Sequence, residues 1–130
     1  MVTLWHVEDR ADRVVGLRRS FRAQVAAVAA DGSDIDAAEL IYGELVGNAE
    51  RHAGGGSVEV RLEVAGEGRP TLVVRDHGPG LRRRASSDDP LAESGRGLAI
   101  VETLARGFAV TDAPDGGTEA RAVLPVLTRS

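Results

Sequence analysis

The chain has 130 residues and a formal net charge of −4 at pH 7, a length that suits one compact domain over residues 1–130. It has no cysteine, which excludes disulfides, thiolate metal sites and thiol catalysis and fits a reducing cytoplasmic location. Its acidic balance and an aromatic content of 3% argue against direct nucleic-acid binding. Every basic residue is arginine, so a phosphate loop of the Gly-Lys-Ser/Thr type is also excluded.

The first half of the chain predicts helices after a short extended segment. Residues 2–7 predict a strand or an extended arm, and no apolar run there or elsewhere approaches the ~20 residues that cross a membrane. From Asp12 the apolar residues recur at helical spacing, which predicts one helix up to "DGSD" at 31–34. Ser33 or Asp34 would cap a second helix over about 35–53.

The second half predicts two hairpins with a helix between them. Strict alternation in "SVEVRLEV" and the later "TLVVRD" predicts paired antiparallel strands. Residues 77–97 show no periodic spacing of apolar residues, which predicts a long loop. Such a loop would be either a functional lid or a disordered segment. A helix follows in "GLAIVETLA", and "PDGG" at 114–117 joins two final strands. We expect an α/β (α+β) fold of two layers, with helices on one face of a mixed, mostly antiparallel sheet.

Three polar residues stand four apart on the second predicted helix, in "ELVGNAERHA". Glu44, Asn48 and His52 therefore share one face. A carboxylate and an amide oxygen suit Mg²⁺, and a carboxylate close to a metal-bound phosphate can act as a base. The competing interpretation is a solvated helix face whose final histidine is stabilised by the helix dipole.

Two glycine-containing motifs follow. In "DHGPG", Asp76 ends a predicted strand and can accept hydrogen bonds from an exocyclic amine, while Gly78 and Gly80 allow a ligand to approach the backbone; the alternative is a plain turn. In "SGRGLAIV", the glycines precede a predicted helix whose free N–H groups would bind an anion beside Arg96. The alternative there is a glycine N-cap with a surface arginine.

Taken together, these motifs resemble the histidine-kinase-like ATPase superfamily, which includes gyrase, the Hsp90 chaperones, histidine kinases and the MutL repair proteins. The likeness extends from about Asp12 to Leu127 and includes "GGT" at 116–118. Within the superfamily, "ELVGNAERHA", "DHGPGL" and "GRGLAIV" look like the bacterial anti-sigma-factor serine kinases. The resemblance implies a Bergerat-type sandwich that binds ATP and Mg²⁺.

The resemblance also implies roles for individual residues. Asn48 would ligate Mg²⁺, and Glu44 would act as the base or organise metal-bound water. Asp76 would bind the adenine amine with help from Thr118, and His52 would lie near the phosphates. The remaining implied nucleotide-binding positions are Gly78, Gly80, Gly95, Arg96, Gly97 and Leu98, with a lid over 81–94.

Three functional hypotheses follow. In the leading one, the protein is a cytoplasmic serine/threonine-protein kinase that binds a sigma factor and phosphorylates a small STAS-type antagonist of the anti-sigma factor. In the second, it is a nucleotide-binding module that sequesters a partner without phosphotransfer. In the third, it is an α/β domain that binds no nucleotide. We expect no helix pair that carries a phosphoacceptor histidine, and therefore we do not expect a complete sensor histidine kinase.

The first ten residues suggest a further expectation. A strand in "TLWHVEDR" would pair across a homodimer, because related kinases associate through their sheets. Trp5 would then lie in the interface, although an isolated tryptophan is also common in a core.

Overall fold

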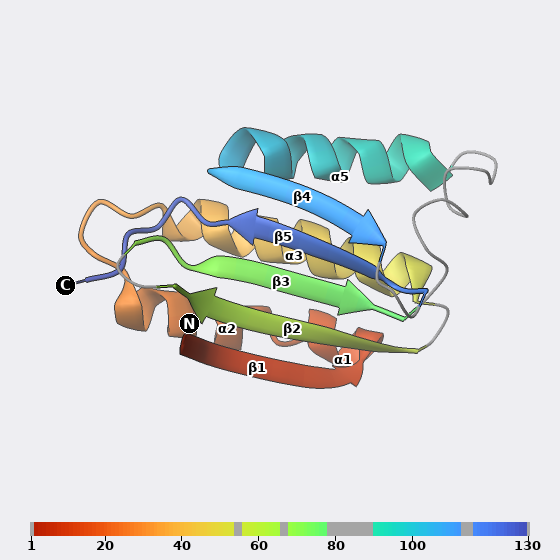
Figure 1. Cartoon of the computed structure of the whole chain (residues 1–130), viewed down its shortest axis with the longest axis horizontal. Helices are drawn as coiled ribbons and strands as arrows, with labels where there is room; N and C mark the ends of the chain where they lie inside the picture. The colour runs from red at the N-terminus through yellow and green to blue at the C-terminus, as the bar shows by residue number, and fades with distance from the viewer. Residues whose placement is uncertain (1, 54–55, 66–67, 78–89, 113–115, 130) are drawn as a thin grey trace.

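A computed structural model of the chain describes residues 2–53, 56–65, 68–77, 90–112 and 116–129, and for residues 90–96 it describes the backbone alone. Figure 1 shows a twisted sheet with helices behind it. In the part of the chain that is described, no helix has the length and apolar character needed to cross a membrane.

Five strands form one open sheet in the order β1-β2-β3-β5-β4. They are β1 (Val2–Arg10), β2 (Ser57–Val64), β3 (Thr71–Asp76), β4 (Gly107–Asp112) and β5 (Thr118–Val123). All four described pairings are antiparallel, so the mostly antiparallel sheet is confirmed and no parallel pair occurs among these strands. Both predicted hairpins, β2–β3 and β4–β5, are present.

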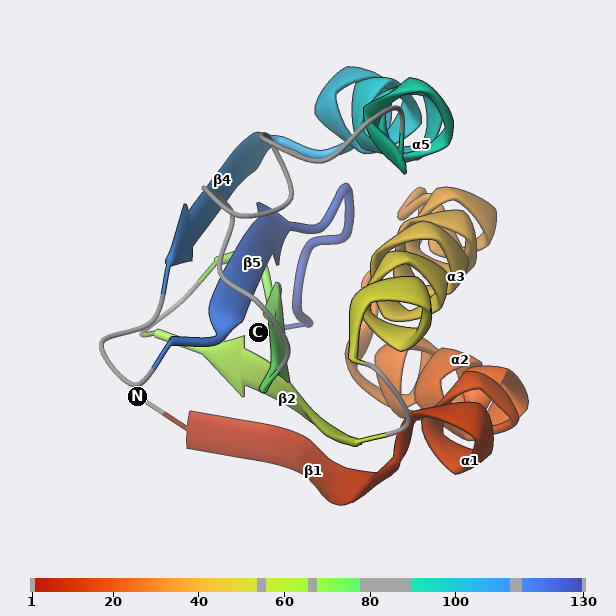
Figure 2. The same cartoon turned by 90° about the vertical axis from the view of Figure 1, so that its right-hand side faces the viewer.

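The helices lie together on one face of the sheet, as the end-on view in Figure 2 shows. They are α1 (Ala11–Val15), α2 (Arg18–Val28), α3 (Ile35–His52) and α5 (Pro90–Leu104). Alternate residues of β2 and β3 are buried against them, among them Val60, Leu62 and Leu72. The two-layer arrangement expected from the order of elements is therefore confirmed.

The helix predicted from Asp12 onward is two helices, because the chain turns at Gly16 and Leu17. The amide of Leu17 donates to the Val14 carbonyl at 3.1 Å, which closes α1 with a tight turn. Glycine is a weak helix former, and at this position it favours the break. The expectation of one continuous helix was therefore wrong, although its apolar spacing correctly identified buried Val14, Phe21 and Val25.

Trp5 packs inside the chain. Its ring centroid lies 6.0 Å from that of Phe21 and 6.2 Å from that of Tyr42. Phe21 and Tyr42 stack at 4.6 Å, and the buried Tyr42 hydroxyl donates to the Val14 carbonyl at 2.6 Å. Burial raises the pKa of this phenol. The cluster joins β1, α2 and α3, so Trp5, which is partly buried, packs against the hydrophobic core. The expectation that β1 pairs across a homodimer stays a prediction.

The long helix α3 begins where the sequence predicts. The Asp34 carboxylate accepts from the amide of Ala37 at 3.0 Å and is therefore the N-cap. The helix ends at His52, with Ala53 as its C-cap, which agrees with the predicted end near Ala53. Its buried face includes Ile41, Leu45 and Ala49, which are directed towards the sheet.

Helix α5 begins at Pro90, seven residues before the predicted start at Gly97. Proline is favourable at the first position of a helix, and the following Leu-Ala-Glu are good helix formers. Gly95, Arg96 and Gly97 consequently lie inside α5. The prediction that these glycines precede the helix was wrong, and residues 90–94 of the predicted lid are helical. Residues 81–89 of that lid lie outside the described residues.

The C-terminal segment connects the C-terminal end of α2 with the N-terminal end of α3 through hydrogen bonds. The amide of Asp34 donates to Pro125 and that of Ala30 to Leu127. The Arg129 guanidinium donates to the Ala27 carbonyl at 2.6 Å, where it satisfies the C-terminal end of α2. This segment therefore stabilises the helix layer at the end where the chain finishes.

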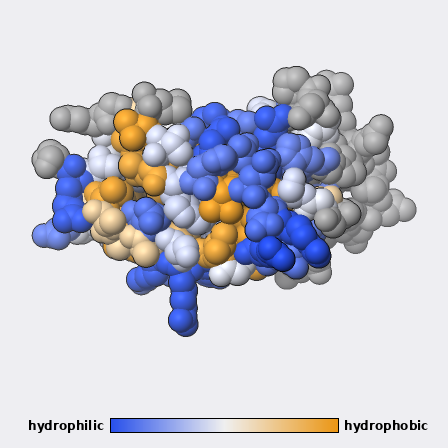
Figure 3. All heavy atoms as spheres, turned by 90° about the horizontal axis from the view of Figure 1, so that it is seen from below, coloured by the Kyte–Doolittle hydropathy of each residue, from blue (hydrophilic) through white to orange (hydrophobic). Residues whose placement is uncertain are grey.

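Hydrophilic side chains dominate the remaining surface. On the sheet face away from the helices, Glu59 accepts from His6 at 2.9 Å, and Arg121 donates to Glu119 at 2.8 Å. Viewed from the β1 side, apolar residues form separate patches among hydrophilic ones (Figure 3). Such isolated patches are ordinary on a globular protein.

Candidate nucleotide-binding site

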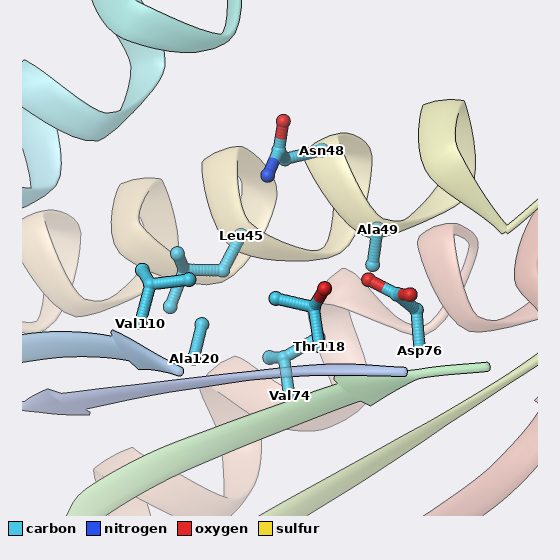
Figure 4. Close-up of a pocket in the computed structure, with 8 residues that line it drawn as sticks. All are labelled: Leu45, Asn48, Ala49, Val74, Asp76, Val110, Thr118 and Ala120. Carbon is cyan, nitrogen blue, oxygen red and sulfur yellow. The ribbon is translucent and has the colours of Figure 1, made fainter. Parts of the chain in front are cut away.

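A small pocket lies between α3 and the strands β3, β4 and β5 (Figure 4). Helix α3 supplies one wall and the strands supply the other. The lining residues are Leu45, Asn48, Ala49, Val74, Asp76, Val110, Thr118 and Ala120. The free space within them is about 10 Å³, roughly enough for one water molecule.

The polar residues of the strand wall are fixed by sheet register. Asp76 ends β3 directly opposite Thr118, the first residue of β5. Each residue is only 4% exposed, and both side chains point into the pocket in Figure 4. The structure therefore brings together the two residues that the sequence assigned to adenine binding.

Asn48 supplies the polar group of the helix wall. Its Oδ1 atom is buried and has no hydrogen-bond partner among the described residues. A buried amide oxygen without a partner is costly, so a ligand or ion that occupies this position would be favoured. An oxygen donor of this kind fits Mg²⁺, which takes few protein ligands and keeps substrate phosphates and waters. The described residues contain no cluster of three or more His, Cys, Asp or Glu side chains that could hold a metal ion.

Glu44 lies one turn before Asn48 and faces α5. It is half-buried, and within the described ranges its carboxylate makes no hydrogen bond or ion pair. Its Oε2 atom lies 2.6 Å from the place where a Cβ atom at Gly97 would be. The carboxylate therefore lies against the backbone of α5.

The other predicted site residues do not line the pocket or are not fully described. His52 is half-buried at the end of α3 but does not line the pocket. Leu98 packs against the hydrophobic core. Gly95 and Arg96 are described by their helical backbone only, and Gly78 and Gly80 lie outside the described residues. Their implied roles at a nucleotide stay predictions.

Gly117 is a residue that the sequence analysis did not single out. A Cβ atom there would overlap the backbone oxygen of Asp76, so no side chain can occupy the position without a shift of the backbone. The missing side chain allows β3 and β5 to approach, so that Asp76 and Thr118 stand side by side. The signal was present in "GGT", where two glycines precede the final strand.

Arg51 is a second residue that the sequence analysis left out. It is exposed, and its Nη1 atom lies 3.8 Å from the Cβ position of Gly47. The side chain thus folds back along α3, as helical side chains commonly do. This arrangement leaves a cation one turn from Asn48, and no ion pair of this arginine occurs among the residues described.

The comparisons with known proteins agree with this geometry. The family described as histidine kinase-like ATPase domain matches residues 7–124. The chain therefore belongs to the histidine kinase-like ATPase domain family. A search of curated proteins finds no match to the sequence.

Two solved structures show the same fold. The mycobacterial sensor histidine kinase MprB aligns with a TM-score of 0.57 and 21% identity, over 95% of this chain and 100% of the other. Histidine kinase AdeS of Acinetobacter baumannii aligns with a TM-score of 0.55 and 16% identity, over 99% of this chain and 70% of the other. At such identities the likeness concerns the fold alone.

Proposed function

We propose that the chain binds ATP and Mg²⁺ in this pocket and transfers the terminal phosphoryl group to a serine or threonine of a small STAS-type antagonist protein. In this proposal it also binds a sigma factor, and the phosphorylation controls that association. The observation that carries the nucleotide site is that Asn48, whose Oδ1 has no partner among the described residues, lines the same pocket as buried Asp76 and Thr118. The family match supports an ATP ligand.

The strand wall favours adenine over guanine. The Asp76 carboxylate accepts hydrogen bonds, so it would pair with the exocyclic amine of adenine. Guanine presents a carbonyl at that position, which would face the carboxylate as a second acceptor. The Thr118 hydroxyl, directly or through a water, would satisfy the neighbouring ring nitrogen.

Asn48 would supply one oxygen ligand to Mg²⁺, and the nucleotide phosphates and water would supply the others. The bound ion would neutralise phosphate charge during transfer. Arg51, which is exposed and within one turn of Asn48, would add a second positive charge. The protein's part in this chemistry is mainly to position the phosphate and the acceptor.

Glu44 would act as the general base. The acceptor hydroxyl oxygen would form a bond to the terminal phosphorus while the bond from that phosphorus to the bridging oxygen breaks, and ADP would leave with the electron pair. The hydroxyl proton would pass to the Glu44 carboxylate and then to solvent. The carboxylate suits this role because it is half-buried and has no described ion pair.

A second candidate function is nucleotide binding that sequesters a partner without phosphotransfer. It is favoured by the helical position of Gly95 and Gly97. The backbone N–H groups of residues inside a helix are used by the helix itself and are not free to hold phosphate. A protein that keeps this arrangement would hold ATP without placing its phosphates for transfer.

The first test is a thermal-shift titration with ATP, ADP and GTP, with and without Mg²⁺. We expect stabilisation by adenine nucleotides, since a ligand that binds only the folded state raises its apparent stability. Asn48→Ala should remove the Mg²⁺-dependent part, and Asp76→Ala should remove the adenine preference. Gln24→Ala, at the chain's other amide side chain, should change neither. Equal responses to GTP and ATP would contradict the assignment of the strand wall.

The second test separates the two candidate functions. The protein is incubated with ATP that is labelled in its terminal phosphate, together with purified STAS-type antagonist candidates. Label on a serine or threonine of the antagonist, lost in Glu44→Gln, supports the kinase. Intact ATP recovered from a stable complex with the partner, with no labelled protein, supports sequestration instead.

A further inference from the structure

Gly97 and Glu44 form a contact between helices α5 and α3. Gly97 is buried and lies on the same side of α5 as Val101, which is fully buried one turn later. A side chain at position 97 would therefore project towards α3. There it would meet Oε2 of Glu44 at 2.6 Å, which is closer than a Cβ atom and an oxygen can approach.

The side chain of Glu44 occupies the space next to Gly97. The three atoms nearest to its Cβ position are Oε2, Cδ and Cβ of Glu44, at 2.6, 3.7 and 4.0 Å. None is a backbone atom. At Gly117, by contrast, the nearest atoms all belong to the backbone of residues 76 and 77. Gly117 lets two strands approach each other, whereas Gly97 makes room for the Glu44 side chain.

The geometry points to Gly97 as the positioning residue of Glu44: the bare backbone of α5 sets where the carboxylate of α3 rests. The inference rests on the proposed role of Glu44 as a base. No described hydrogen bond or ion pair fixes that carboxylate, so packing against α5 is the described contact that constrains it.

This assignment differs from a phosphate cradle. In α5 the backbone of Gly97 lies well inside a helix that begins at Pro90. Glycine there lowers helix stability relative to alanine, so its presence calls for a steric reason. The Glu44 contact supplies that reason from the described atoms, without a nucleotide.

A stability cycle tests the contact without any need for activity. With alanine at position 44 no carboxylate stands in the way, so Gly97→Ala should raise the Tm by about 3 °C through helix propensity. With Glu44 present, the same substitution must displace the carboxylate and should raise the Tm less, or lower it. Equal Tm changes in the two backgrounds would show that no contact exists and would overturn the inference.

An activity cycle tests the role. Gly97→Ala should leave the Kd for ATP within about twofold yet lower kcat by about 100-fold, because displacement of a reacting group by an ångström has that effect. Glu44→Asp shortens the side chain by one methylene, so the double variant Glu44→Asp/Gly97→Ala should recover activity relative to Gly97→Ala alone. In Glu44→Gln, Gly97→Ala should change kcat no further.

The matched control is Thr103→Ala, on the exposed face of the same helix, whose hydroxyl donates to the Ala99 carbonyl of its own helix. It should leave the Kd and kcat unchanged. Loss of ATP binding in Gly97→Ala, without recovery by Glu44→Asp, would overturn the inference in favour of a direct nucleotide contact. Absence of ATP binding or turnover in the wild-type protein would instead contradict the proposed function, and the stability cycle would still decide the contact.

Discussion

Asp76 and Thr118 lie directly opposite each other across β3 and β5, and both are almost fully buried at one wall of the pocket. A carboxylate and a hydroxyl in this relationship present an acceptor beside a group that both donates and accepts. Asp112 pairs with Thr118 from the other side, in β4. The polar lining of this wall is therefore determined by how β3 and β5 align.

Thr118→Val should weaken ATP binding while leaving the fold intact, since valine has nearly the same shape and lacks the hydroxyl. Loss of one hydrogen bond from a buried partner costs about 1–3 kcal/mol, which corresponds to roughly a tenfold to hundredfold rise in Kd. Equilibrium binding of a fluorescent ATP analogue measures this Kd. Thr111→Val, at an exposed position of β4, is the control and should bind as the wild type does. An unchanged Kd for Thr118→Val would remove Thr118 from the site.

Gly117→Ala should destabilise the sheet where the pocket is built. Its Cβ atom would collide with the Asp76 backbone oxygen, and such overpacking costs about 1–3 kcal/mol. Urea denaturation followed by circular dichroism gives the free energy of unfolding. Gly107→Ala offers a comparison in the neighbouring strand, because a Cβ atom there meets Val123 at an ordinary 3.4 Å. Similar losses in both variants would contradict the close approach at Gly117.

Tyr42 should make stability fall at high pH. Burial raises the pKa of its phenol in the folded state above the value of about 10 that it has when unfolded. As the pH rises, the unfolded chain therefore loses the phenol proton before the folded chain does. The stability that the protonated phenol contributes to the folded state is complete below about pH 10 and declines as the pH rises further. Urea denaturation at about pH 8 and about pH 11 should show a smaller loss for Tyr42→Phe than for the wild type.

Tyr42→Phe also has a cost that does not depend on pH. It removes the hydrogen bond from the hydroxyl to the Val14 carbonyl at 2.6 Å, which contributes about 0.5–1.5 kcal/mol because that carbonyl still accepts from the amide of Leu17. At about pH 8 the variant should thus be less stable than the wild type. The same pH dependence in both proteins would show that Tyr42 is not the responsible group, and Tyr42 is the chain's single tyrosine.

Arg129→Ala should loosen the end of α2. The guanidinium donates to the Ala27 carbonyl at 2.6 Å and to that of Ala26 at 3.5 Å. A partly exposed hydrogen bond of this kind contributes about 0.5–1.5 kcal/mol. Hydrogen exchange should show faster amide exchange in the last turn of α2, with little change in β3. Arg19→Ala, an exposed position at the other end of the same helix, should leave the exchange pattern as it is.

Much of the fold could be predicted from local patterns, because these patterns have local causes. The alternation in β2 and β3 places one face in the core whatever the neighbouring strands do. Asp34 caps α3 through a bond to a residue three positions away. Such contacts lie within a few residues, so the sequence alone contains the information.

The errors arose where glycine has two opposite uses. Gly16 was taken as part of a helix and ends one, whereas Gly95 and Gly97 were taken as the start of a helix and lie within one. The contact of position 97 with Glu44 comes from the packing of α3 against α5, which local sequence patterns do not give. Likewise, the neighbours of Asp76 depended on sheet order, which is set by contacts distant in sequence.

The aromatic cluster around Trp5 gives the protein an intrinsic optical label. Trp5 is the chain's single tryptophan, and its contacts with Phe21 and Tyr42 come from two different helices. Its emission should therefore shift when β1, α2 and α3 separate, and energy transfer from Tyr42 should cease at the same time. Neither Trp5 nor Tyr42 lines the pocket, so the signal reports on the assembly of the first half of the chain.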